Sequence, residues 1–147
     1  MKISRSYLLL VLIGGTAELC ARTLLLNVPP GSRRDFDLLP GFGVGVYLNT
    51  GSVFGFAIPN NIMIAVMAMA LVGILFYWRR RTLVANEAGA LLLIAVGAIL
   101  NISNRILYGG VVDYIHIPFG GVINLADVMI ALGAASLVFK AETRYAK

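Results

Sequence analysis

The sequence predicts an all-α membrane protein with four transmembrane helices and a small extracytoplasmic β element between the first and second spans. One observation is composition, because 59% of the 147 residues are hydrophobic and only 13% are charged. This balance excludes a water-soluble globule and a disordered chain. A second observation is that four apolar stretches each reach the length of about 20 residues that a helix needs to cross a bilayer. We expect a single domain that covers residues 1–147.

The four predicted spans are residues 7–27, 57–78, 83–102 and 121–139. Basic residues precede the first span, separate the second from the third and follow the fourth. Because Lys and Arg in short loops are retained on the cytoplasmic side, both termini are predicted to be cytoplasmic, with segments 28–56 and 103–120 outside. This topogenic charge explains most of the net charge of +5. We therefore expect membrane lipids as partners and no nucleic acid.

The first outer segment has the pattern of short strands. Over residues 41–57, glycine alternates with Phe, Val and Tyr, and Asn49-Thr50-Gly51 is typical of the turn between two strands. The alternative is an irregular loop whose aromatic side chains anchor in lipid headgroups. The sequence leaves both interpretations open.

Two aspartates, Asp113 and Asp127, lie at the outer edges of two apolar spans that a short loop joins. A carboxylate in a membrane span costs roughly 2.5–3.5 kcal/mol at mid-helix, so such a residue indicates function. If the fourth span begins at Gly121, Asp127 lies about 9 Å along it and close to the outer surface. We expect the two carboxylates to meet there. A structural alternative is that Asp113 is a loop carboxylate and Asp127 an internal hydrogen-bonding strut.

A close pair of carboxylates in a pocket of low dielectric constant shares one proton, which separates the two apparent pKa values. Aspartic proteases use this arrangement. The ionised member takes a proton from water, and the protonated member polarises the peptide carbonyl. The pair therefore predicts peptide hydrolysis without a covalent intermediate.

Polar residues near the two aspartates share helical faces with them. Gly97, Asn101 and Arg105 recur at i, i+4 and i+8 of the third span. Asn124 and Asp127 are three residues apart on the fourth span and also share a face. These two faces are expected to border the same site.

Amide and small side chains complete the predicted site. Small Ala126 lets another backbone approach the fourth span, and Arg105 offsets negative charge nearby. The amides, which hold substrate backbone or fix the carboxylates, come from Asn49, Asn101 and Asn124.

Glu18 and Arg22 are four residues apart on the first span, in the order that favours an ion pair. The first interpretation is an internal ion pair that lowers the cost of insertion. The second is a role beside the active site.

Cys20 is the only cysteine, which excludes an internal disulfide and a Cys-based metal site. The run that ends there imitates a lipoprotein signal peptide, but Leu19 stands where such signals need a small residue. His116 is the only histidine, and one imidazole is poor evidence for a metal. We expect no metal and no other cofactor.

In their order and spacing, these motifs resemble the bacterial lipoprotein signal peptidases, or type II signal peptidases, over nearly the whole chain. Residues 48–55 are similar to the family motif Asn-x-Gly-Ala-Ala-Phe-Gly. Residues 97–105 and 108–115 resemble Gly-Ala-Leu-Gly-Asn-x-x-Asp-Arg followed by Gly-x-Val-x-Asp-Phe-Ile. Residues 122–127 resemble Phe-Asn-x-Ala-Asp.

The resemblance implies an aspartic endopeptidase of the bacterial inner membrane whose catalytic dyad is Asp113 and Asp127. It implies that the substrate is a prolipoprotein with a diacylglyceryl group on its lipobox cysteine, and that cleavage falls just before that cysteine. The enzyme is expected to act as a monomer, with its active site near the outer face. The residues implied to bind substrate or support the dyad are Asn49, Gly51, Asn101, Arg105, Asn124 and Ala126.

The chain departs from the family pattern at several positions. Glu18 and Arg22 stand where the family usually has Asp and Lys, Asn104 replaces an Asp, and Leu100 replaces a glycine. None of these changes touches the dyad, so we expect a divergent but active peptidase. Two other functions stay open from the sequence, namely a non-cleaving binder of lipoprotein precursors and a small proton- or ion-conducting bundle.

Overall fold

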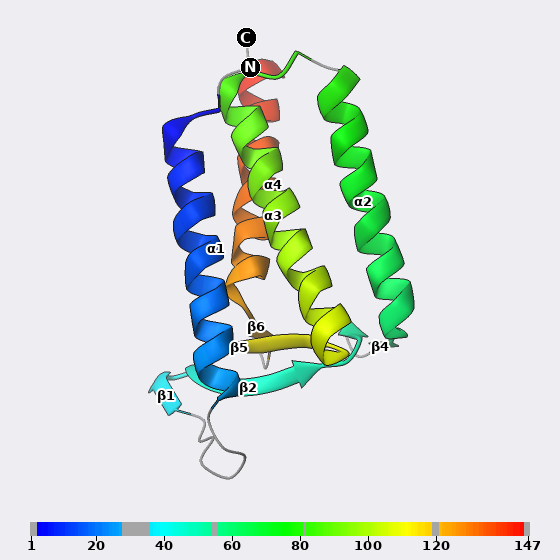
Figure 1. Ribbon diagram of the computed structural model, residues 1–147. Coiled ribbons are helices and arrows are strands. Elements are labelled where there is room, and N and C mark those ends of the chain that lie inside the picture. Colours follow the sequence, from blue (N-terminus) through cyan, green and yellow to red (C-terminus); the bar gives the residue numbers. More distant parts are fainter. Residues whose placement is uncertain (1–2, 28–35, 54–55, 81, 119–120, 146–147) are drawn as a thin grey trace.

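The computed structural model describes residues 3–27, 36–53, 56–80, 82–118 and 121–145. In this part of the chain, four helices stand beside one another and a small sheet lies across one end of the bundle (Figure 1). We call this the sheet end. The opposite end, where α1 begins, α2 passes to α3 and α4 ends, is the terminal end. The helices are α1 (Arg5–Leu26), α2 (Asn60–Arg80), α3 (Ala85–Tyr108) and α4 (Leu125–Tyr145).

Among the described helices, α1, α2 and α3 are long and apolar enough to cross a membrane, while the apolar part of α4, Leu125–Phe139, is shorter. The predicted helical bundle is confirmed. The predicted end of the third span at residue 102 was wrong, because α3 continues to Tyr108. The helix stops where Gly109 adopts a left-handed φ of 74°, a common helix terminator.

The predicted start of the fourth span at Gly121 was also wrong. Residues Gly121–Ile123 form strand β6, and α4 begins only at Leu125. Asp127 is therefore the third residue of α4, in its first turn, and not about 9 Å along the helix.

The β element between the first two spans is confirmed, but it is larger than expected. Its strands β1 and β2 form one sheet with β5 and β6, in the antiparallel order β1-β2-β5-β6. The segment before α4 contributes half of this sheet, because Val111–Ile117 is rich in β-branched and aromatic residues that favour strands. The bounds are β1 (Phe36–Leu39), β2 (Phe42–Asn49), β5 (Val111–Ile117) and β6 (Gly121–Ile123).

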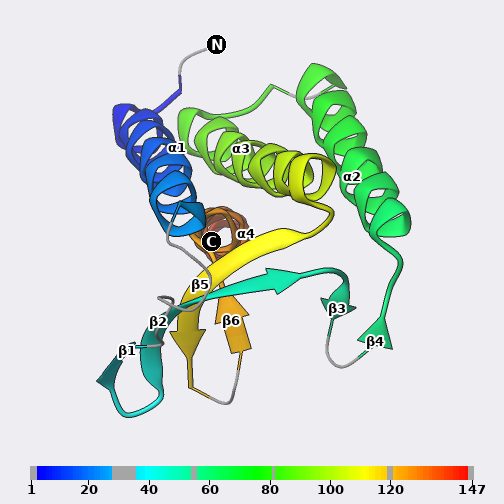
Figure 2. The same ribbon diagram turned by 60° about the horizontal axis from the view of Figure 1, so that its bottom comes forward.

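The turn at Asn49-Thr50-Gly51 lies between two strands, as predicted. It joins β2 to β3 (Ser52–Val53), which pairs with β4 (Phe56–Ala57) in a separate two-stranded sheet. Figure 2 shows this small sheet beside the start of α2, while the larger sheet passes beneath α1 and α4.

Helix α3 is the centre of the bundle and packs most closely against α4. A Cβ atom added to Gly97 would lie 2.6 Å from the carbonyl oxygen of Ala126. A Cβ atom added to Gly133 would lie 2.7 Å from the carbonyl oxygen of Ala90. Small residues thus bring the two backbones together at both places. Helix α2, in contrast, has no buried residue.

Candidate active site

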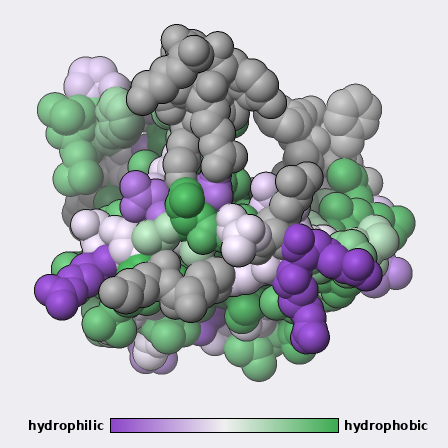
Figure 3. All heavy atoms as spheres, turned by 90° about the horizontal axis from the view of Figure 1, so that it is seen from above, coloured by the Kyte–Doolittle hydropathy of each residue, from purple (hydrophilic) through white to green (hydrophobic). Residues whose placement is uncertain are grey.

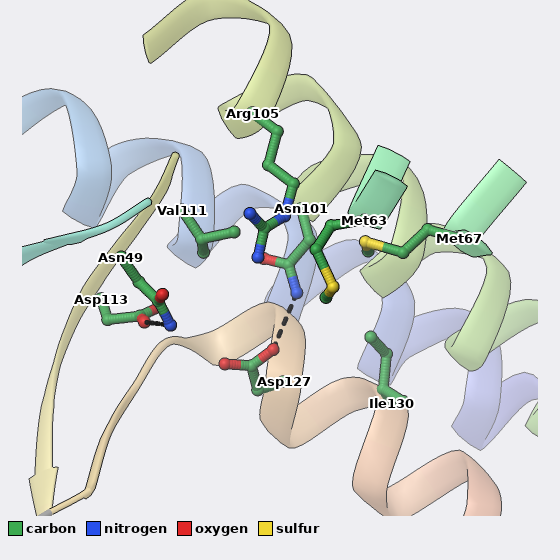
Figure 4. Close-up of a pocket in the computed structure, with 9 residues that line it drawn as sticks. All are labelled: Asn49, Met63, Met67, Asn101, Arg105, Val111, Asp113, Asp127 and Ile130. Carbon is green, nitrogen blue, oxygen red and sulfur yellow. Dashed lines mark hydrogen bonds between the residues drawn. The ribbon is translucent and has the colours of Figure 1, made fainter. Parts of the chain in front are cut away.

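Asp113 of β5 and Asp127 of α4 line one open pocket at the sheet end (Figure 4). The pocket has a volume of about 280 Å³. The antiparallel sheet brings Asp113 here, because Asp113 pairs with Tyr47 of β2 beneath the helices. The lining residues are Asn49, Met63, Met67, Asn101, Arg105, Val111, Asp113, Asp127 and Ile130.

Asp113 is only 2% exposed, and amide groups bond to both of its carboxylate oxygens. Asn49 Nδ2 donates to Oδ2 at 3.3 Å, and Asn124 Nδ2 donates to Oδ1 at 2.9 Å. Burial, followed by the nearby charge of Asp127, raises the pKa of Asp113 to about 7. The two amide bonds and the charge of Arg105 oppose this rise.

The Asp127 carboxylate is held at both oxygens as well. Asn101 Nδ2 donates to Oδ1 at 2.7 Å, and the backbone N–H of Asn124 donates to Oδ2 at 3.3 Å. In return, Asn124 Oδ1 accepts the backbone N–H of Asp127 at 2.9 Å. This reciprocal pair is a capping box at the start of α4, and it fixes the rotamer of Asp127.

Asn124 connects the two carboxylates. Its Nδ2 group donates to Asp113 and also to Asn101 Oδ1 at 3.0 Å. Asn101 in turn donates to Asp127. A continuous chain of hydrogen bonds therefore runs from Asp113 through two amides to Asp127.

Gly51 orients Asn49 from the turn after β2. The Gly51 N–H donates to Asn49 Oδ1 at 3.1 Å, in the manner of an Asx turn. The φ of Gly51 is 138°, and a Cβ atom would lie 2.0 Å from the carbonyl oxygen of Ile58. Only glycine fits this turn.

Arg105 and Ala126 hold the helices around the pocket. Arg105 donates to Asn60 Oδ1 at 3.0 Å, and Asn60 Nδ2 donates back to the Arg105 carbonyl at 3.2 Å. Ala126 is fully buried and lets α4 lie against Gly97 of α3. Asn60 was not among the residues predicted from the sequence, although a polar residue at the start of an apolar span was a signal for it.

The predicted ion pair between Glu18 and Arg22 was wrong. Glu18 Oε2 instead accepts the Tyr114 hydroxyl at 2.7 Å and the backbone N–H of Leu125 at 3.1 Å. Arg22 donates to Asn104 Oδ1 at 2.9 Å. Each side chain bonds to a neighbouring element that offers a partner, so the two do not bond to each other.

Tyr114 was also missed. The available signal was a tyrosine next to Asp113 where the family motif has Phe. Of the other departures, Leu100 packs in the core between α3 and α4, and Asn104 is fully buried beside Arg22. Cys20 is exposed on α1. In the part of the chain that is described, no three His, Cys, Asp or Glu residues form a group that could hold a metal.

The chain is similar to one family of known proteins over most of its length. The family model of signal peptidase (SPase) II matches residues 9–142. A lipoprotein signal peptidase of Pseudoalteromonas translucida is 32% identical over 136 residues, which cover 86% of this chain and 81% of that relative. One from Vibrio cholerae is 29% identical over 143 residues, which cover 90% and 84%.

Two solved structures of bacterial membrane enzymes have the same fold. One has a TM-score of 0.80 at 16% identity and covers 97% of this chain and 91% of that one. The other has a TM-score of 0.79 at 18% identity and covers 95% of each. Because the family model spans nearly the whole chain, the protein belongs to the signal peptidase II family, the aspartic endopeptidases of the bacterial inner membrane that remove signal peptides from prolipoproteins.

Proposed function

We propose that Asp113 and Asp127 are the catalytic pair of this peptidase and share a single proton. The observation that carries the proposal is the chain of hydrogen bonds through Asn124 and Asn101, which joins the two carboxylates in one pocket. Two ionised carboxylates close together in a site shielded from water would repel each other. A single proton shared between them removes most of that cost.

Asp113 is the member that holds the proton near neutral pH, because burial and the Asp127 charge raise its pKa to about 7. Its hydroxyl donates to the oxygen of the scissile carbonyl. The Asp127 carboxylate accepts a proton from water, and the water oxygen bonds to the carbonyl carbon. When the carbon–nitrogen bond then breaks, the leaving nitrogen takes the proton from Asp127, and the new carboxyl group departs. Arg105 stabilises the negative charge that develops.

The substrate of this site is a prolipoprotein whose lipobox cysteine carries diacylglyceryl, cut just before that cysteine. The pocket suits such a substrate because one wall is polar and the other apolar. Met63 and Met67 of α2 and Ile130 of α4 line the side of the pocket away from Asp113 (Figure 4). An acylated cysteine requires both kinds of surface.

The topology that we propose has α4 as the fourth span, both termini in the cytoplasm and the sheet end outside. Strongly hydrophilic residues lie on the terminal end, seen face-on in Figure 3, and Arg79 and Arg80 lie in the last turn of α2 there. In a Cys20→Ser background, an impermeant thiol reagent should label Thr50→Cys in cells with a permeabilised outer membrane. It should leave Thr82→Cys, between α2 and α3, unlabelled until the inner membrane is opened. The reverse pattern would contradict the topology.

The test of the catalytic pair uses Asp113→Asn and Asp127→Asn separately, with a lipidated prolipoprotein peptide in detergent. Each change keeps the shape of the side chain but removes its acid/base chemistry, so each should reduce cleavage by about 1,000-fold or more. The melting temperature should stay within a few degrees of the unaltered protein. Glu87→Gln, the same change at the terminal end, is the matched control and should cleave normally.

Robust turnover by either Asn variant would exclude the shared-proton mechanism. Binding of the peptide by the unaltered protein without any product would instead indicate a non-cleaving binder.

A further inference from the structure

A single carboxylate oxygen of α1 bonds to both elements that carry the two aspartates. Glu18 Oε2 accepts the hydroxyl of Tyr114 on β5 and the backbone N–H of Leu125 on α4. Glu18 is 0% exposed and Tyr114 is 5% exposed. The three groups form a closed triangle, because the Leu125 N–H also lies 3.4 Å from the Tyr114 hydroxyl oxygen.

On β5, Tyr114 directly follows Asp113. Successive side chains of a strand point to opposite faces, so Asp113 faces the pocket while Tyr114 faces α1. Burial raises the pKa of the Tyr114 hydroxyl, and its bond to Glu18 raises it further. The phenol therefore stays protonated and remains a donor to Glu18.

On α4, the bond from Glu18 reaches the first N–H of the helix, two residues before Asp127. The first N–H groups of a helix have no partner within it, and Glu18 Oε2 supplies a partner for the Leu125 N–H. Glu18 therefore fixes where α4 begins relative to β5. A displacement of about 1 Å between catalytic groups can cost about 100-fold in rate.

We propose that Glu18 and Tyr114 are positioning residues that set the spacing of Asp113 and Asp127 from outside the pocket. This inference rests on the catalytic pair proposed above. We call Glu18 and Tyr114 together the clamp. Neither residue lines the pocket, so the clamp acts on the chemical step and not on the binding of substrate.

Tyr114→Phe is the sharpest variant, because it removes one hydroxyl and leaves the ring in place. We expect kcat to fall about 10-fold, since the buried hydrogen bond that joins β5 to α1 is lost. The KM should stay within twofold and the melting temperature within a few degrees. Tyr77→Phe, on an exposed ring of α2, is the matched control and should leave kcat unchanged.

Glu18→Gln and Glu18→Leu form the second arm. Gln keeps an oxygen that can accept both bonds, while Leu keeps none. The Gln variant should therefore retain more kcat than the Leu variant. Because Tyr114 and Glu18 act through one bond, Tyr114→Phe combined with Glu18→Gln should lose less than the product of the two single losses. If Glu18→Leu does not fold, the kcat values of Tyr114→Phe and Glu18→Gln still test the proposal.

Normal kcat in Tyr114→Phe would overturn the clamp, as would a loss of melting temperature with kcat unchanged. Fully additive losses in the double variant would overturn it as well. None of these results affects the catalytic pair, which fails only if Asp113→Asn or Asp127→Asn still cleaves.

Discussion

The two ends of the helical bundle are held together by different interactions. In the described part of the chain, all of the buried polar and charged residues lie at the sheet end. At the terminal end, α3 buries only small and aliphatic residues. The polar set is Glu18, Arg22, Asn101, Asn104, Arg105, Asp113 and Asn124, and the apolar set is Ala88, Gly89, Ala90, Leu91 and Leu93.

The sheet end also holds the buried side-chain atoms that have no hydrogen-bond partner in the described part of the chain. Buried polar atoms usually have hydrogen-bond partners. In the described part of the chain, the four side-chain atoms without one are Glu18 Oε1, Arg22 Nε, Asn104 Nδ2 and Arg105 Nε. All four belong to the parts of α1 and α3 at the sheet end. The sheet end therefore gives up stability for the arrangement of its polar groups, while close packing at the terminal end supports the fold.

The largest effect should come from Asn124→Ala, which breaks the sheet end at its most connected residue. It removes the donor to Asp113, the donor to Asn101 and the acceptor of the Asp127 N–H. We expect kcat to fall by about 1,000-fold, as when a catalytic hydrogen-bond donor is removed. Steady-state kinetics with the lipidated peptide measures this change.

Asn61→Ala is the matched control, because Asn61 is exposed at the same end of the bundle. It should cleave at the normal rate. A loss in Asn61→Ala equal to that in Asn124→Ala would mean that the amide chain has no special role.

Gly133→Leu tests the opposite end. A Cβ atom there would meet the Ala90 carbonyl oxygen at 2.7 Å and Ile94 Cγ1 at 2.6 Å. Overpacking of this kind costs about 1–3 kcal/mol, so the melting temperature in detergent should fall while kcat per folded molecule stays within a few-fold. Gly73→Leu, where nothing lies within 4 Å of an added Cβ, should leave both unchanged. A loss of kcat without a loss of stability in Gly133→Leu would mean that the packing of α3 against α4 does not mainly support the fold.

The helices and the sheet end also differ in how much of each could be predicted from the sequence. The helices were predicted because long apolar runs have few alternatives in a membrane. The shared face of Gly97, Asn101 and Arg105 followed from helical spacing alone. These are local properties of the chain, and they describe most of α1, α2 and α3.

The sheet and its contacts with α1 depend on partners far apart in the sequence. Strand β5 was missed although its residues favour strands, because nothing local in the sequence shows that β2 lies beside it, with Asp113 opposite Tyr47. Glu18 and Arg22 fit an i, i+4 ion pair, but partners up to 107 residues away bond to them instead. No local pattern of residues indicates such partners.

The pH dependence of cleavage tests the protonation of Asp113 at the sheet end. Asp113 loses its proton as the pH rises through about 7, so kcat should fall above that pH. In Asn49→Ala, one of the bonds that lower this pKa is lost, so the fall should move to higher pH. A pH profile of kcat measures both effects. A fall that stays in place or moves to lower pH would contradict the role of Asn49.

The raised pKa of Asp113 also affects stability. The folded state binds this proton more tightly than the unfolded state, so the stability that it contributes is present at low pH. This contribution is lost as the pH rises from about 4 to about 7. Melting temperatures over that range should decline more in the unaltered protein than in Asp113→Asn.

The smallest effect should come from α2, which has no buried residue and yet contributes one wall of the pocket. Met67 lines the pocket, whereas Met69, two residues along, is 65% exposed. Met67→Ala should raise the KM for the acylated peptide several-fold, because it removes apolar contact area, with little change in kcat. Met69→Ala should leave both within twofold. Equal effects of the two would mean that α2 acts only as a membrane anchor, and that substrate lies against α3, α4 and the sheet alone.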